Sequence, residues 1–84
     1  MNYTVLVLRR AEKELAELPT QDYRQVIEAI RVLGAEPRPP GCGKLAGRDG
    51  WRIRVGRYRV IYEIDDKART LTVLNVGHRK EIYR

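Results

Sequence analysis

Two short segments joined by one glycine and one arginine constrain the fold of this chain most strongly. In WRIRV, residues 51–55, and YRVIYEI, residues 58–64, side chains alternate with a period of two, which indicates β-strands. The link Gly56-Arg57 has room only for a tight turn, so the two strands form an antiparallel hairpin. After a turn at residues 65–68, a third strand is expected over residues 69–76. Its alternate residues are apolar on both sides, which predicts a central position in the sheet.

The first half of the chain predicts one strand followed by two amphipathic helices. Residues 3–8 are expected to form the strand. Apolar residues then recur at spacings of three and four in two segments separated by Pro19, which ends the first helix. Thr20 is the predicted N-cap of the second helix and Gly34 its predicted C-terminal cap. The stripes are Leu8, Ala11, Leu15 and Leu18 in the first helix and Tyr23, Val26, Ile27, Ile30 and Leu33 in the second.

The element order is strand, helix, helix and three strands. Three prolines and two glycines between residues 35 and 43 indicate a surface loop without a regular element. With 84 residues and no compositional break, residues 1–84 form a single domain. We therefore expect an α+β fold in which a helical hairpin packs on a four-stranded, mostly antiparallel sheet.

The charge distribution narrows the classes of partner. Residues 51–84 hold nine Lys or Arg against four Asp or Glu, whereas residues 1–50 hold eight against seven. A positive field concentrated in one half attracts polyanions, chiefly nucleic acid, and also acidic protein segments or anionic membrane surfaces. A basic surface that serves solubility has the same composition. No apolar run approaches the roughly 20 residues needed to cross a bilayer, so we expect a cytoplasmic protein with no membrane partner.

The residue types present exclude most kinds of catalytic site. The chain has no serine for a Ser-based triad, and one histidine with one cysteine makes no zinc-type ligand set. The segment GCGK is not a phosphate loop, because Leu45 stands where Ser or Thr would have to follow Lys44. We therefore expect no metal and no cofactor. A role for Cys42 has no support in the sequence.

The alternation places Arg52, Arg54 and Arg59 on the sheet face opposite the helices, where they are predicted to be solvent-exposed. Because the two strands are neighbours, Arg59 should lie close to Arg52 or Arg54. Like charges opposite one another are unfavourable by up to about 1 kcal/mol, so the cluster suggests an anionic partner. Charges on an edge strand that block aggregation produce the same pattern.

Phosphate binding by guanidinium groups, with proton transfer by His78, Tyr83 or a lysine, is the chemistry that these residues offer. Cleavage of a phosphodiester without a metal is plausible where the substrate carries its own nucleophile, as RNA does in its 2′-hydroxyl. Arginines stabilise charge on the phosphate but serve poorly as a base. Four aromatic residues could stack on bases: Trp51, Tyr58, Tyr62 and Tyr83. For Trp51, Tyr58 and Tyr62 the alternation favours a place in the core.

Three segments of the sequence resemble the RelE/ParE superfamily of toxins from toxin-antitoxin systems, and its RelE branch in particular. They are Lys44-Leu45-x-Gly47, the block from Trp51 to Tyr62, and the closing VGHRKEIYR. The resemblance extends over the whole chain in length and element order. It implies a ribosome-dependent mRNA endonuclease, which cuts the message in the ribosomal decoding site by attack of the 2′-hydroxyl. It also implies a cognate antitoxin protein that neutralises the toxin.

The resemblance assigns roles to individual residues. Arg52 and Arg54 match positions, commonly lysines in the family, that hold and activate the scissile region. Arg59 matches an arginine that stabilises the phosphate in the transition state. Arg79 matches a tail arginine assigned to phosphate stabilisation or to protonation of the leaving group. Additional RNA contacts are expected from Lys44, Lys80 and Arg84.

The resemblance leaves two candidates for the general base that takes the proton from the RNA 2′-hydroxyl, because this chain has arginines where the family commonly has lysines. Tyr83 matches a terminal tyrosine proposed as base or as stacking group, and its ordinary pKa is about 10. His78, with an ordinary pKa of about 6.5, is a rival proton carrier. We expect Tyr83 to position the substrate.

Two other functions fit the sequence. The ParE branch shares the fold but inhibits DNA gyrase, and it generally lacks the complete basic site with the terminal tyrosine. A passive module that binds nucleic acid or an acidic peptide fits the charge equally well. In such a module the tail tyrosine would be dispensable.

Overall fold

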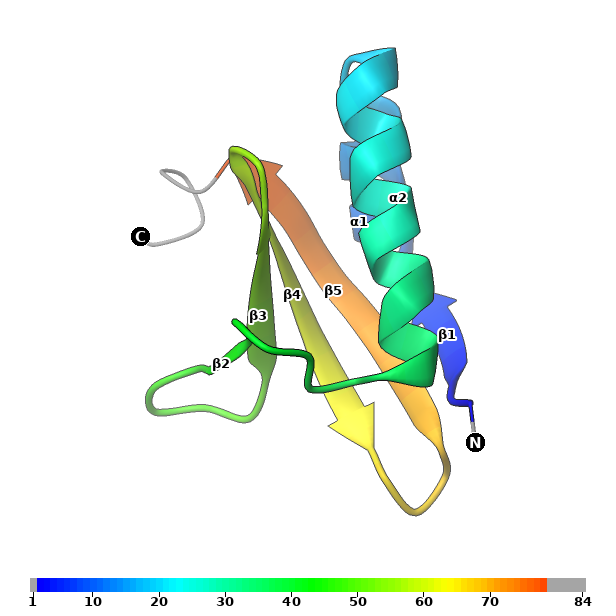
Figure 1. The fold of residues 1–84 in the computed structure, drawn as a ribbon, viewed down its shortest axis with the longest axis vertical. Coiled ribbons are helices and arrows are strands. Elements are labelled where there is room, and N and C mark those ends of the chain that lie inside the picture. The colour runs from blue at the N-terminus through cyan, green and yellow to red at the C-terminus, as the bar shows by residue number, and fades with distance from the viewer. Residues whose placement is uncertain (1, 79–84) are drawn as a thin grey trace.

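The structure, a computed structural model, describes residues 2–78 and has two helices on one side of a mixed sheet (Figure 1). The predicted α+β class is confirmed. The sheet has five strands instead of the predicted four, in the order β1-β5-β4-β3-β2, because two residues of the loop pair with β3. The elements are β1 (Thr4–Val7), α1 (Arg9–Ala16), α2 (Thr20–Ala35), β2 (Gly43–Lys44), β3 (Trp51–Val55), β4 (Tyr58–Asp65) and β5 (Thr70–His78).

Strand β5 lies between β1 and β4, so its predicted central position is confirmed. It runs parallel to β1 and antiparallel to β4. Its register with β4 shifts by one residue after Ile61, which leaves Leu74 as the extra residue of a bulge. Beside this bulge, the Val76 N–H donates a hydrogen bond of 2.7 Å to the Glu14 carboxylate, which ties α1 to β5.

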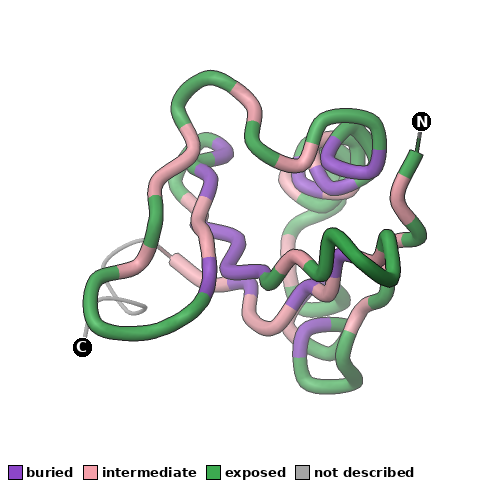
Figure 2. Tube along the Cα trace, turned by 90° about the horizontal axis from the view of Figure 1, so that it is seen from below, coloured by how far each residue is buried: buried purple, intermediate pink, exposed green. Residues whose placement is uncertain are grey.

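The predicted apolar stripes hold both helices to the sheet except at their ends. Figure 2 shows the buried stretches in the middle of the molecule and the exposed ones along its outer loops. Leu8 and Tyr23 belong to the predicted stripes, but they are 42% and 40% exposed and lie outside the core. No helix within residues 2–78 is long and apolar enough to cross a membrane. The buried helical residues are Ala11, Leu15, Val26, Ile30, Leu33 and Gly34.

Both predicted caps of α2 are wrong. The helix begins with Thr20 itself, because the Tyr23 N–H bonds to the Pro19 carbonyl at 2.8 Å, and Pro19 occupies the N-cap position. At the other end the helix continues to Ala35, so Gly34 lies inside it. Gly34 lies at a close approach to β1. A Cβ placed there would lie 3.2 Å from Val5 Cγ2, and the Gly34 carbonyl accepts a hydrogen bond of 2.7 Å from the Tyr3 N–H.

Candidate nucleic-acid interface

The sheet face away from the helices carries the three arginines of β3 and β4, which we call the arginine cluster: Arg52, Arg54 and Arg59. Arg54 lies directly opposite Arg59 in the β3–β4 ladder, which confirms their predicted closeness. Directly paired residues project to the same face of a sheet. With Pro40 and Gly41 of the loop, the cluster lines a hollow of about 450 Å³.

The burial of the cluster differs from the prediction. Arg59 was expected to be solvent-exposed, and this is wrong: it is only 4% exposed, whereas Arg52 is half-buried and Arg54 is exposed. Arg59 lies on the interior strand β4, with Arg54 on one side and Gly77 on the other. A cation in such a low-dielectric position interacts more strongly with an incoming anion than one in open water.

The alternative explanation, charges that protect an edge strand, fails for Arg59 because β4 has partners on both sides. It also fits Arg52 poorly, since β2 pairs with β3 at that residue. Only Arg54, beyond the short β2, stands on an open part of β3. Anion binding therefore explains more of the cluster than protection of an edge does.

Gly43 is a residue of the site that the sequence did not reveal. It lies on β2 directly opposite Arg52, and the Arg52 guanidinium occupies the space beside its Cα. No local pattern marks it, because the relation depends on how a loop pairs with a strand. The only signal in the sequence is the glycine in GCGK, which suits a close approach of any kind.

His78 lies on the other face of the sheet from the arginine cluster. It pairs with Tyr58, and the two rings meet edge to face with centroids 6.0 Å apart. The Tyr58 hydroxyl donates a hydrogen bond of 2.8 Å to Asp22 on α2, so this face is the one covered by the helices. That hydrogen bond, with some desolvation, raises the pKa of Tyr58 above its ordinary value. His78 is therefore not brought to the arginines.

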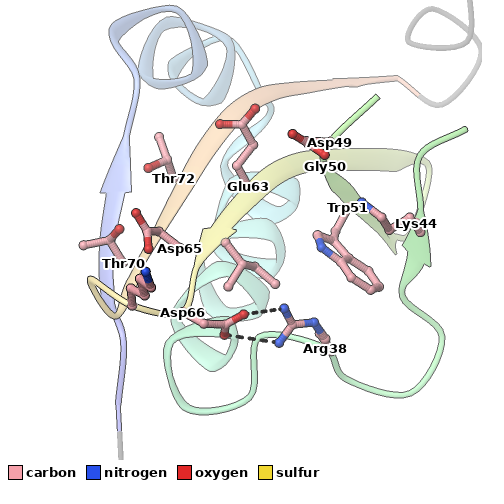
Figure 3. A pocket seen from close by; sticks show the side chains of 12 residues that line it. Arg38, Lys44, Asp49, Gly50, Trp51, Glu63, Asp65, Asp66, Thr70 and Thr72 are labelled. Atoms are coloured by element: carbon pink, nitrogen blue, oxygen red, sulfur yellow. Dashed lines mark hydrogen bonds and ion pairs between the residues drawn. The ribbon is translucent and has the colours of Figure 1, made fainter. Parts of the chain in front are cut away.

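Lys44 is also directed away from the cluster. Its ammonium lies 5.4 Å from the centroid of the Trp51 ring, and the Arg38 guanidinium lies 5.1 Å from the same ring (Figure 3). Arg38 also forms an ion pair of 2.9 Å with Asp66. The indole is thus engaged by two cations and packs against the core. These contacts favour a structural role for Trp51 over base stacking.

The remaining candidates are Arg79, Lys80, Tyr83 and Arg84, which lie outside the described residues. Among residues 2–78, no group of three or more His, Cys, Asp or Glu side chains could hold a metal ion. The chemistry available in the described part of the site is therefore cationic: guanidinium groups that bind and stabilise a phosphate.

A family model described as the ParE toxin of the type II toxin-antitoxin system parDE matches residues 5–83. The chain belongs to the RelE/ParE family of toxins. Toxin RelG of Mycobacterium tuberculosis is 39% identical to it, with 100% of this chain and 99% of RelG aligned. The membership confirms the predicted family and identifies a toxin of a type II toxin-antitoxin system.

Two solved structures share the toxin fold. The RelE-RelB complex from Pyrococcus horikoshii matches with a TM-score of 0.85 and 33% identity, over 96% of this chain and 99% of that one. The toxin-antitoxin complex RelBE2 from Mycobacterium tuberculosis matches with a TM-score of 0.84 and 32% identity, over 94% of this chain and 100% of that one. Both therefore share the overall fold of this toxin.

Proposed function

We propose that this toxin is a ribosome-dependent endoribonuclease that cleaves translated mRNA and so inhibits translation. In this reaction the RNA 2′-hydroxyl attacks the adjacent phosphorus, a cyclic phosphate forms, and the 5′-oxygen of the next nucleotide leaves with a proton. The observation that carries the proposal is the arginine cluster, in which three arginines line one hollow and one of them is almost fully buried. Cations held in place before the reaction stabilise the negative charge that develops on the phosphate.

The three arginines have different surroundings, which suggests a division of work. Arg59 is almost fully buried on an interior strand, so it is suited to the phosphate whose charge increases in the transition state. Arg54 is exposed and suits the flanking backbone of the substrate, and Arg52 suits the scissile region. By the family resemblance, Arg79 would protonate the leaving oxygen or stabilise the phosphate. Tyr83 would position the substrate or act as base.

The arginines are weak acid-base groups, so orientation of the message must supply much of the rate. A ribosome that holds the codon in the decoding site would provide that orientation. His78 faces the helices, and we assign it no part in contact with the phosphate. A ribosomal substrate would also place the toxin in the cytoplasm.

Primer extension on a translated message after induction of the toxin tests this proposal. We expect cuts inside codons with the wild type, and loss of cutting with Arg59→Ala. Arg59 is buried, so Arg54→Ala, at an exposed position, serves as a second variant whose folding is less at risk.

Arg57→Ala is the matched control, because it removes the same charge from the exposed β3–β4 turn outside the cluster. It should keep the cutting activity. An intact message in wild-type cells would refute the proposal. Equal losses in Arg54→Ala and Arg57→Ala would show that only net charge matters.

A second candidate function is inhibition of DNA gyrase, because the matching family model is described as a ParE toxin. The same induced cultures distinguish the two activities. Stalled replication with intact mRNA would favour the gyrase target. Cut mRNA in cells whose replication stops only later would favour the nuclease.

The partner that we propose is a cognate antitoxin, since two of the solved relatives are toxin-antitoxin complexes. An acidic antitoxin segment over the arginine cluster would block RNA by the same electrostatics that attract it. The product of a neighbouring reading frame, mixed with the toxin, should bind with an affinity that falls as salt rises. Arg54→Ala should weaken this binding more than Arg57→Ala, and equal binding by both variants would place the antitoxin elsewhere.

A further inference from the structure

Gly43 and Arg52 form a directly opposed pair at the edge of the sheet, on the face of the arginine cluster. A Cβ atom placed on Gly43 would lie 1.5 Å from Nη1 of Arg52 and 2.6 Å from its Cζ. The guanidinium thus occupies the space in which the side chain of any other residue would begin. We infer that Gly43 is a positioning residue: its missing side chain lets Arg52 lie across β2 and directs this arginine into the phosphate site. The inference rests on the proposed function.

The loop before β2 is anchored in a way that keeps Gly43 in this position. The hydroxyl of Tyr62, which is fully buried, donates a hydrogen bond of 2.7 Å to the Pro37 carbonyl. Burial raises the pKa of Tyr62 well above its ordinary value, so the hydroxyl remains a donor at all ordinary pH values. Further along, the Cys42 N–H bonds to the Pro39 carbonyl at 3.0 Å. These contacts bring the loop back to β3 immediately before Gly43.

On the far side, the Leu45 N–H bonds to the Gly50 carbonyl at 3.0 Å and closes the loop that follows β2. Lys44 pairs with Trp51, which sets the register of the two-residue strand. Gly43 is therefore held from both sides. Arg52 has a defined surface to lie on, and less of its rotamer freedom has to be lost when a phosphate binds.

The effect of adding a side chain at position 43 can be worked out from these distances. The φ angle of Gly43 is not in the left-handed region, and the three atoms nearest to an added Cβ all belong to the flexible end of Arg52. Alanine should therefore cost little stability. The guanidinium must instead move by roughly 2 Å to reach an ordinary van der Waals distance. A misplacement of about 1 Å in a catalytic site can cost about 100-fold in rate.

The placement of Arg52 can be tested without any assay of activity. In the NMR spectrum of the full-length toxin, the α-protons of Gly43 should show cross-peaks to the side-chain Nε proton or the δ-protons of Arg52. In Gly43→Ala these protons should shift, while the amide spectrum of the core stays unchanged. A well-resolved wild-type spectrum without such cross-peaks would overturn the inference.

The functional part is tested by the rate of cleavage of ribosome-bound mRNA. We expect Gly43→Ala to lose on the order of 100-fold, and Arg52→Ala to lose at least as much. Because Gly43 acts through Arg52, the double variant should be no slower than Arg52→Ala. A Gly43→Ala protein as fast as the wild type, or losses that multiply in the double variant, would overturn the inference.

Gly47→Ala, in the loop that follows β2, is the matched control. Its φ of 72° strains any side chain, but nothing lies within 4 Å of an added Cβ. Gly47→Ala should lose stability and keep its cleavage rate. Gly43→Ala should keep its stability and lose cleavage rate. If the wild type does not cut mRNA, the proposed function fails, and the NMR cross-peaks still decide where Arg52 lies. If Arg52→Ala cuts normally, Arg52 has no part in the site, and Gly43 positions nothing.

Discussion

Replacing Gly34 by alanine tests whether the close approach of α2 to β1 decides the residue at that position. Two effects oppose one another. Alanine in a helix interior is favoured over glycine by about 1 kcal/mol, because glycine loses more backbone freedom on folding. Against this, the new Cβ would lie 3.2 Å from Val5 Cγ2 and 3.3 Å from the Tyr3 carbonyl oxygen. Extra atoms in a well-packed position cost about 1–3 kcal/mol.

The crowding should prevail because neither neighbour can move easily. The Tyr3 backbone is held by its own hydrogen bond of 2.7 Å to the Gly34 carbonyl. Val5 pairs with Leu71 in the β1–β5 ladder, and its branched side chain has few rotamers to choose from. We therefore expect Gly34→Ala to lower the free energy of unfolding by about 1 kcal/mol.

Chemical denaturation measures this change, and the thermal midpoint should fall by about 4–8 °C for a domain of this size. Ala35→Gly, at the exposed neighbouring helical position, gives the helix-propensity term alone. In a Val5→Ala background the cost of Gly34→Ala should shrink, since one of the two crowded contacts is gone. A gain of about 1 kcal/mol on Gly34→Ala would show that helix propensity acts unopposed and would refute the close approach.

Two further changes test the anchors of the loop and of β1. Tyr62→Phe should lower the free energy of unfolding by about 1 kcal/mol, because the Pro37 carbonyl loses its donor; an unchanged denaturation midpoint would contradict the anchor. Asp66→Asn tests the pH dependence. Hydrogen bonds from Arg38, chiefly, and Tyr3 hold the pKa of Asp66 below its ordinary 3.8. Its stabilising contribution is thus present above pH 3.8 and lost as pH falls through the folded-state pKa. The variant should be less stable than the wild type near neutral pH, and the difference should vanish in acid; a difference independent of pH would exclude this role.

The parts of the site that sequence reasoning predicted correctly depend on short-range geometry. Arg54 and Arg59 lie on strands that are joined by a two-residue turn, and alternation along each strand then fixes which face they share. Their closeness follows without knowledge of the rest of the fold. The burial of Arg59 does not follow in this way, because it depends on what surrounds the side chain in the folded protein.

The caps of α2 show a similar limit. Thr20 and Gly34 are residue types that suit helix ends, and local preference alone placed them there. With Thr20 as the N-cap, the helix would begin at residue 21. In the structure it begins at Thr20 and continues past Gly34. The close approach of β1 leaves little room for a side chain at position 34, so a tertiary contact, and not a helix end, accounts for a glycine there.

Periodicity, turn chemistry and charge were sufficient to establish the class of fold, the hairpin, the central last strand and the grouping of the arginines. They act between residues that are near one another along the chain, where backbone geometry leaves few alternatives. Only the tertiary structure decided that Gly43 lies beneath Arg52, that Arg59 is buried and that His78 faces the helices. These relations join segments far apart in sequence, and their register is set by packing and hydrogen bonding that no local pattern encodes.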